Sequence, residues 1–131
     1  MIGLDTNVLA RYILQDDELQ SPKADRAIES LTSENPGWIG LSTLLELVWV
    51  LSSTIRPKRE EMASMVDALL TMDGIVVEQA KVVKQALDLF LAGRADFADC
   101  LIAASARAAG CSRTVTFDRV AARDAGMELI G

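Results

Sequence analysis

The chain contains no histidine, and its two cysteines are Cys100 and Cys111. The absence of histidine excludes an imidazole base, a histidine-ligated zinc ion and every Ser–His–Asp arrangement. The two isolated thiols form neither the close CxxC pairs of zinc sites nor the dense pairing of disulfide-rich secreted proteins. Any catalysis must therefore depend on carboxylates, lysine, hydroxyl groups or a bound metal ion.

Long hydrophobic runs are also missing. The longest apolar stretch, residues 41–51, is shorter than the roughly 20 residues that span a bilayer, and it contains Glu46. No basic leader followed by an apolar segment and a small-residue cleavage site is present. These features predict a soluble cytoplasmic protein with no membrane association.

Positive charge is in deficit, with 13 Lys and Arg residues against 19 Asp and Glu residues and a net charge of −6. Phosphate contacts need basic groups, so this balance argues against nucleic-acid binding unless a site is locally basic or recruits cations. Because 50% of the residues are hydrophobic, disorder is not expected. At 131 residues, the length predicts one domain with a single core, residues 1–131.

Short apolar stretches alternate with longer segments of helical periodicity. The helical pattern is clear between Met62 and Leu70, and Ser21-Pro22 predicts the start of another helix. Such alternation predicts an α/β fold with a parallel sheet covered by helices. The expected strands are Ile2–Leu4, Trp38–Leu41, Ile75–Val77, Thr114–Phe117 and Met127–Ile130.

Four carboxylates stand at or near the ends of these strands. Asp5 and Asp118 directly follow the first and fourth strands, and Glu46 lies in the opening turns of the helix after the second. Ligands of parallel sheets bind beyond the carboxyl ends of the strands, so these three acids are expected at one edge. Asp99, in the first turn of a helix that begins near Asp96, reaches that edge only if the preceding helices return there.

Each acid also has a structural interpretation as a capping or first-turn group of a helix. Asp5 would cap the first helix, and Thr43-x-x-Glu46 would form a capping box. Asp96 would be an N-cap with Asp99 as a first-turn acid. Asp118 would cap a short helix that runs to Arg123. Taken together, converging carboxylates raise one another's pKa unless a cation compensates. The cluster therefore favours a hard cation, because Mg²⁺ and Mn²⁺ prefer carboxylate and water oxygens.

Four motifs resemble the PIN-domain ribonucleases, above all the VapC toxins of bacterial toxin–antitoxin pairs. They are DTNVLAR, STLLELVWVL, ADFADCLIAA and TFDR, and they occur in the expected order along the whole chain. The resemblance implies a three-layer PIN-like fold with a parallel five-stranded sheet flanked by helices. It also implies that Asp5, Glu46, Asp99 and Asp118 are the catalytic, metal-binding acids, and that Thr6, Asn7 and Thr116 support them. Asp96 is an extra acid for which capping is favoured over metal binding.

The implied activity is an Mg²⁺-dependent endoribonuclease, with Mn²⁺ as a substitute, in which a metal-activated water hydrolyses RNA phosphodiester bonds. Arg11 and Arg119 stand nearest the acidic motifs and are the first candidates for phosphate contacts. The resemblance further implies a VapB-like antitoxin partner. A homodimer is expected as well, because the helix around Trp49 is apolar nearly all round.

Several alternatives remain open at this point. Within the nucleases, the same pocket would serve a stand-alone RNA-processing enzyme or a DNA flap nuclease, although a small chain favours compact RNA substrates. A phosphatase with Asp5 as nucleophile is disfavoured, because its D-x-D motif needs an aspartate where Asn7 stands. The alternative outside enzymes is a PIN-like fold kept as a binding module with a silent pocket.

Overall fold

A computed structural model describes all residues from Met1 to Gly131. The chain divides into two compact units, each described by itself. Unit 1 comprises Met1–Lys58 and Ala68–Glu78, and unit 2 comprises Arg59–Asp67 and Gln79–Gly131. None of the helices has the length and apolar character needed to cross a lipid bilayer.

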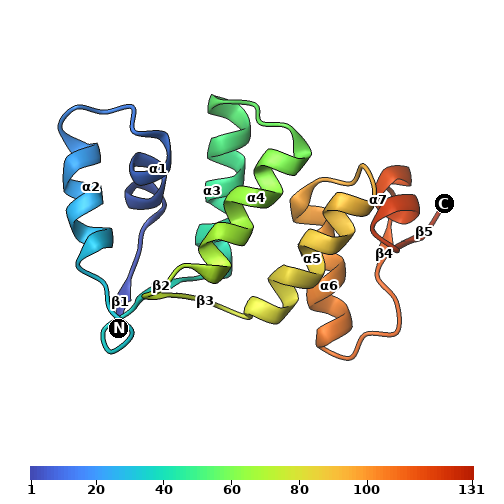
Figure 1. Cartoon of the computed structure of the whole chain (residues 1–131). Helices are drawn as coiled ribbons and strands as arrows, with labels where there is room; N and C mark the ends of the chain where they lie inside the picture. Colours follow the sequence, from blue (N-terminus) through green and yellow to red (C-terminus); the bar gives the residue numbers. More distant parts are fainter. The chain divides into compact units, whose positions relative to one another are not determined.

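Unit 1 is built on a three-stranded parallel sheet with the order β1-β2-β3. Helix α1 packs against both α2 and α3, and α1 lies beside α2 in Figure 1. The core of the unit consists of fully buried aliphatic side chains, among them Leu9, Ile39, Leu44 and Leu47. The elements are β1 (Ile2–Gly3), α1 (Thr6–Leu14), α2 (Gln20–Glu29), β2 (Gly37–Ile39), α3 (Leu41–Thr54), the second part of α4 (Arg59–Thr71) and β3 (Ile75–Val77).

Unit 2 combines the first part of α4 with a helix pair and a two-stranded parallel sheet. Helices α5 and α6 pack along each other (Figure 1), and the rings of Phe90 and Phe97 meet edge to face, 6.0 Å apart. Around them the small or aliphatic side chains of Val83, Ala86 and Leu87 are buried. The elements are α5 (Ala80–Ala92), α6 (Phe97–Ala108), β4 (Val115–Thr116), α7 (Arg119–Asp124) and β5 (Glu128–Leu129).

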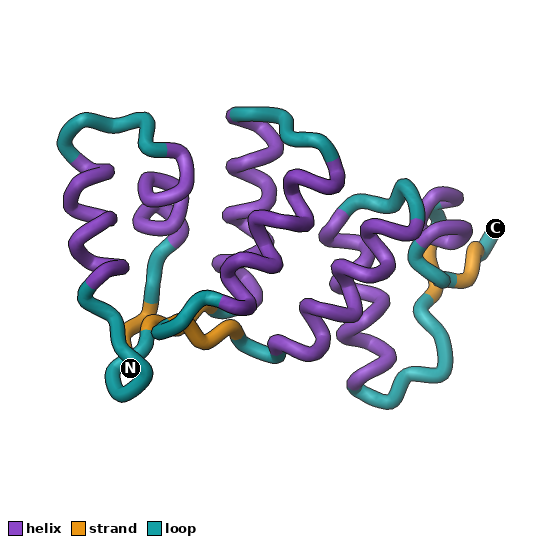
Figure 2. The backbone as a smooth tube through the Cα atoms, viewed as in Figure 1, coloured by secondary structure: helices purple, strands orange, loops and turns teal.

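The predicted α/β fold with parallel strands is confirmed, and a strand is present at each of the five expected places. β3 has the predicted bounds, β2 begins one residue earlier than predicted, and the other three strands are shorter than predicted. The predicted single five-stranded sheet is wrong, because the strands form one sheet of three and another of two. Each strand contains only two or three residues. The strands are the orange segments of Figure 2. Such strands supply few ladder hydrogen bonds, and each ladder forms among strands of one unit.

The predicted start of α2 is also wrong. The helix begins at Gln20 and ends at Glu29, and the side chain of Asp17 accepts a 2.7 Å hydrogen bond from the backbone N–H of Gln20. The Ser21 hydroxyl instead donates to the carbonyl oxygen of Arg11 at 3.0 Å. An ionised carboxylate is the stronger acceptor for the N–H groups of the first turn, so Asp17 takes the role predicted for Ser21.

The start of α3 depends on a residue that follows the neighbouring strand, β3. Gly40 is the N-cap and provides no side chain, and Glu78 Oε1 accepts the N–H of Leu41 at 2.8 Å. Glu78 directly follows β3, which pairs with β2, so the sheet brings this carboxylate to the start of α3. The predicted Thr43–Glu46 capping box is therefore wrong, and Glu46 has no capping role.

We expect Glu78→Ala to lower the free energy of unfolding by about 1–2 kcal/mol, because a charged acceptor for a helix N-terminus is lost. Glu78→Gln keeps an acceptor oxygen and should lose less. Glu29→Ala, at an exposed glutamate that ends α2, is the control and should change little. Urea unfolding measures all three, and a Glu78→Ala variant as stable as the control would contradict the capping role.

Candidate active site

Asp5 stands where the first strand becomes the first helix. The N–H of Leu4 donates to the carbonyl of Trp38 at 2.9 Å, so the chain follows the sheet up to the residue before Asp5. Asp5 then occupies the N-cap of α1 with extended backbone, yet its side chain accepts no capping hydrogen bond. The capping interpretation of Asp5 is therefore wrong, and its exposed carboxylate is available at the carboxyl end of β1.

Glu46 is the second acid of unit 1. It lies in α3, which packs against α1, and its side chain is exposed while Leu44, Leu47 and Val48 from the same helix are buried. Because Glu78 provides the acceptor at the start of α3, Glu46 is not required there. Unit 1 thus carries two exposed acids that stabilise no helix end.

The supporting residues of α1 lie in different surroundings. Thr6 is buried, with 4% of its surface exposed, whereas Asn7 is exposed and lines a groove of about 240 Å³ between α1 and α2. Arg11 lines the same groove, and its guanidinium donates to Gln20 at 2.8 Å and pairs with Asp16 at 3.1 Å. A phosphate contact by Arg11 stays a prediction.

In unit 2, Asp96 and Asp118 are both helix N-caps. Asp96 Oδ1 accepts the N–H of Asp99 at 2.8 Å, which confirms the capping role favoured for Asp96. Asp118 Oδ1 accepts the N–H groups of Val120 and Ala121 at 2.8 and 3.0 Å. The backbone of Asp118 is fixed in turn, because its N–H donates to the Thr116 hydroxyl at 3.0 Å.

Asp99 lies in the first turn of α6, close to both of these caps. Its pKa is raised above the ordinary value, first by partial burial and then by the negative charges of Asp96 and Asp118. No basic side chain contributes to this shift. The ionised form of Asp99 is therefore under strain in the metal-free protein, and a cation bound beside it would relieve that strain.

The chemistry of the available donors fits a hard cation. Carboxylate oxygens are the preferred ligands of Mg²⁺ and Mn²⁺. Cys100, the residue after Asp99, is buried, and burial raises the pKa of its thiol to about 11. A thiol held in its protonated form is a poor metal ligand, so a soft-metal site at this position is disfavoured.

The predicted acids are divided between the two units. Asp5 and Glu46 belong to unit 1, and Asp99 and Asp118 belong to unit 2. No group of three or more Asp, Glu or Cys side chains has an arrangement that could hold a metal ion. The joint four-acid site thus stays a prediction, as does the role of Arg119, an exposed residue that begins α7.

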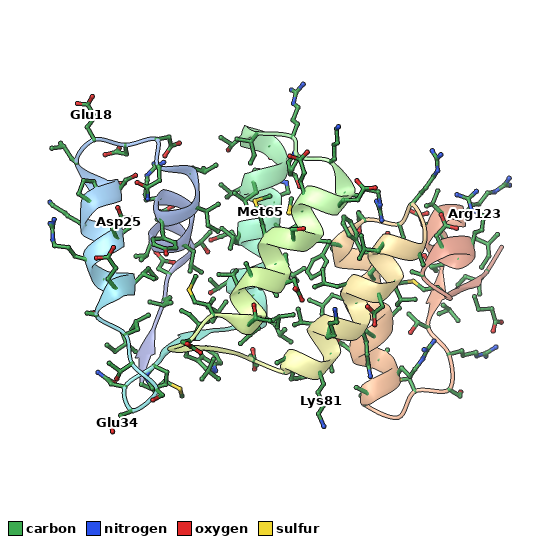
Figure 3. The ribbon with its side chains drawn as sticks, in the orientation of Figure 1. Glu18, Asp25, Glu34, Met65, Lys81 and Arg123 are labelled. Atoms are coloured by element: carbon green, nitrogen blue, oxygen red, sulfur yellow. The ribbon has the colours of Figure 1, made fainter.

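Sequence reasoning missed the residues that hold these helices from a distance. Besides Glu78, they include Asp124 at the end of α7, which accepts the N–H of Arg94 at 2.8 Å and pairs with Arg123, labelled in Figure 3. The hydrogen bonds to Arg123 and Arg94 lower the pKa of the Asp124 carboxyl. No local pattern signals such contacts, because Arg94 and Asp124 are 30 positions apart.

We expect Asp99→Asn to raise the free energy of unfolding of the metal-free protein at pH 7. As the pH rises past about 4, the ordinary pKa of aspartate, the unfolded chain loses this proton before the folded chain does. The folded state then binds more protons, so stability falls through this range until the pH passes the raised pKa of Asp99.

Asparagine carries no titratable proton, so Asp99→Asn should remove the part of the pH dependence of stability that comes from Asp99. Denaturant unfolding in EDTA between pH 3.5 and 7 measures it, with Asp73→Asn, at an exposed acid after α4, as the control. An Asp99→Asn variant with the same pH dependence as the wild type would contradict the electrostatic strain.

Comparison with known proteins identifies the family of this chain. The PIN domain family matches residues 2–126, a range that includes all four candidate acids. A VapC ribonuclease of Aquifex aeolicus (strain VF5) is 25% identical over 117 residues, which cover 88% of this chain and 86% of that protein. The resemblance drawn from the motifs is thereby confirmed. The chain belongs to the PIN domain family and is similar to VapC ribonucleases.

Proposed function

We propose that this protein is a metal-dependent endoribonuclease and the toxin of a VapBC-type toxin–antitoxin pair. In this proposal Asp5, Glu46, Asp99 and Asp118 together hold Mg²⁺, for which Mn²⁺ substitutes. The ion, when bound, activates water and stabilises the charge that develops on the leaving oxygen during phosphodiester hydrolysis. The similarity to the VapC ribonuclease supports RNA as the substrate class.

The observation that carries this proposal is the unrelieved negative charge around Asp99. Its pKa is raised by burial and by two neighbouring carboxylates, without a basic partner. Such an arrangement costs stability in the metal-free protein, and perturbed carboxylates of this kind are typical of functional sites. The exposed Asp5 and Glu46 complete the donor set, since neither caps a helix through its side chain.

The other residues have distinct tasks in this proposal. Asp96 caps the start of α6 and thereby positions Asp99. Asp118 caps the start of α7, and the capping bonds hold its own carboxylate in place. Thr6, Asn7 and Thr116 support the acids, with Thr116 already bonded to the backbone of Asp118. Arg11 and Arg119 are the proposed phosphate contacts.

Oligomerisation and partners follow from the same proposal. Trp49 on α3 is 69% exposed, an unusual state for a tryptophan, and a homodimer through this helix face would cover it. The partner of the toxin is a VapB-like antitoxin, and the pair acts in the cytoplasm. Residues 1–131 form the single functional PIN domain in this proposal.

Incubation with a total RNA pool in Mg²⁺, Mn²⁺ or EDTA tests the activity. We expect discrete cuts that need the metal ion and leave 5′-phosphate ends, which end-specific sequencing detects. Asp5→Ala and Asp99→Ala should each reduce the rate by more than about 100-fold, because a metal ligand is lost. Both variants should remain folded by circular dichroism.

The control variant is Asp73→Ala, which removes one exposed carboxylate outside the proposed site. It should cleave like the wild type. Full activity of either Asp5→Ala or Asp99→Ala would overturn the assignment of that acid. A wild-type protein without cuts under any metal would favour the silent binding module.

A further inference from the structure

The loop between α5 and α6 is held by hydrogen bonds from two other helices of unit 2, α4 and α7. This connection, residues 93–96, leads directly into the N-cap of α6 and thus sets the position of Asp99. Arg59 of α4 donates a hydrogen bond to the loop, and Asp124 of α7 accepts one from it. We define these two contacts as the loop clamp.

Arg59 uses its guanidinium to bridge the end of α5 and the start of α6. Its Nη2 donates to the carbonyl oxygen of Ala95 at 2.6 Å, and Nε and Nη2 both donate to the carbonyl oxygen of Phe90. The guanidinium carbon also lies 3.8 Å from the centre of the Phe90 ring. The Phe90 carbonyl belongs to the last turn of α5, where carbonyls lack helical partners. Arg59 therefore satisfies that helix end while it holds the residue before Asp96.

Asp124 fixes the same loop to α7. Its Oδ2 accepts the N–H of Arg94 at 2.8 Å. Gly93 permits this approach, since a Cβ atom there would lie only 2.7 Å from the Cβ of Asp124. The opposite end of α7 is capped by Asp118. The loop clamp thus links the start of α6, with Asp99, to the helix that begins at Asp118.

We infer that Arg59 and Asp124 are positioning residues of the metal site, because the loop clamp sets the placement of Asp99 relative to Asp118. This inference rests on the proposed function and adds two residues to it. Neither residue is one of the proposed metal ligands. The requirement is geometric: Mg²⁺ demands near-ideal octahedral coordination, so a small shift of one carboxylate weakens binding.

The charge of Arg59 and its positioning role have opposite effects on metal affinity. Removal of a positive charge near acidic groups favours a bound cation electrostatically. Loss of the loop clamp misplaces Asp99 and weakens binding. The direction of the change in an Arg59→Gln variant therefore separates the two effects.

Calorimetric titration with Mn²⁺ alone is the first measurement. We expect the dissociation constant to rise about tenfold in Arg59→Gln, the size typical of residues that orient metal ligands, and to recover partly in Arg59→Lys. Asp124→Ala should show a similar rise, and Asp124→Asn, which keeps an acceptor for Arg94, a smaller one. Lys81→Gln removes a charge from the start of α5, where Lys81 projects into solvent (Figure 3), and should match the wild type.

The thiol of Cys100 reports on the loop clamp without any metal. Cys100 is buried with its Sγ 3.9 Å from the carbonyl oxygen of Ala95, whereas Cys111 is exposed. A thiol reagent should label Cys111 rapidly and Cys100 slowly in the wild type. Arg59→Gln should accelerate the slow phase at least tenfold, and Lys81→Gln should not.

The outcomes distinguish the two levels of the proposal. A wild-type protein that binds no Mn²⁺ would overturn the proposed function and the metal role of the loop clamp, whatever the labelling rates. Normal Mn²⁺ binding with unchanged affinity in a folded Arg59→Gln variant would overturn the inference alone. Tighter binding in that variant would show that Arg59 acts through its charge.

Discussion

The backbone N–H groups at the start of each helix need acceptors, and this constraint organises the candidate site. At the start of three helices a carboxylate accepts a backbone N–H: Glu78 at α3, Asp96 at α6 and Asp118 at α7. Unpaired N–H groups would cost free energy if they were buried, so these acids are fixed in place by the fold itself. The acids that are not needed for capping, Asp5 and Glu46, remain exposed.

The electrostatic consequence is concentrated at α6. Its N-cap Asp96 must lie next to the first turn, and the first turn carries Asp99. A helix N-terminus normally stabilises a nearby carboxylate, yet the pKa of Asp99 is raised, because burial and the charges of Asp96 and Asp118 outweigh that effect. A site that sacrifices stability in this way is typical of function, since stability alone would favour a neutral residue there.

Local patterns in the sequence predicted most of the secondary structure and the caps of α6 and α7. Alternating apolar segments located all five strands, because their period and β-branched residues are local signals. The predictions failed where a helix end is held by a residue far away in the sequence. Glu78 takes the place of the predicted Thr43–Glu46 box, although it is 37 positions from Leu41, whose N–H it accepts. Arg59 and Ala95, whose carbonyl it binds, are 36 positions apart. The pairing of short strands into two sheets is likewise a long-range outcome that no single segment encodes.

A carboxylate that caps a helix can also bind a metal ion, and this holds for both Asp96 and Asp118 in unit 2. Both cap bonds of Asp118 end on Oδ1, and the cap bond of Asp96 also ends on Oδ1. A carboxylate has two oxygens and about four lone-pair directions, so the second oxygen of each residue retains its capacity to coordinate a cation. The cap then serves the site, because it fixes the carboxylate plane before any ion arrives. From the sequence, Asp96 could be either a helix cap or a metal ligand. Its capping role does not prevent it from binding a metal ion, and the same is true of Asp118.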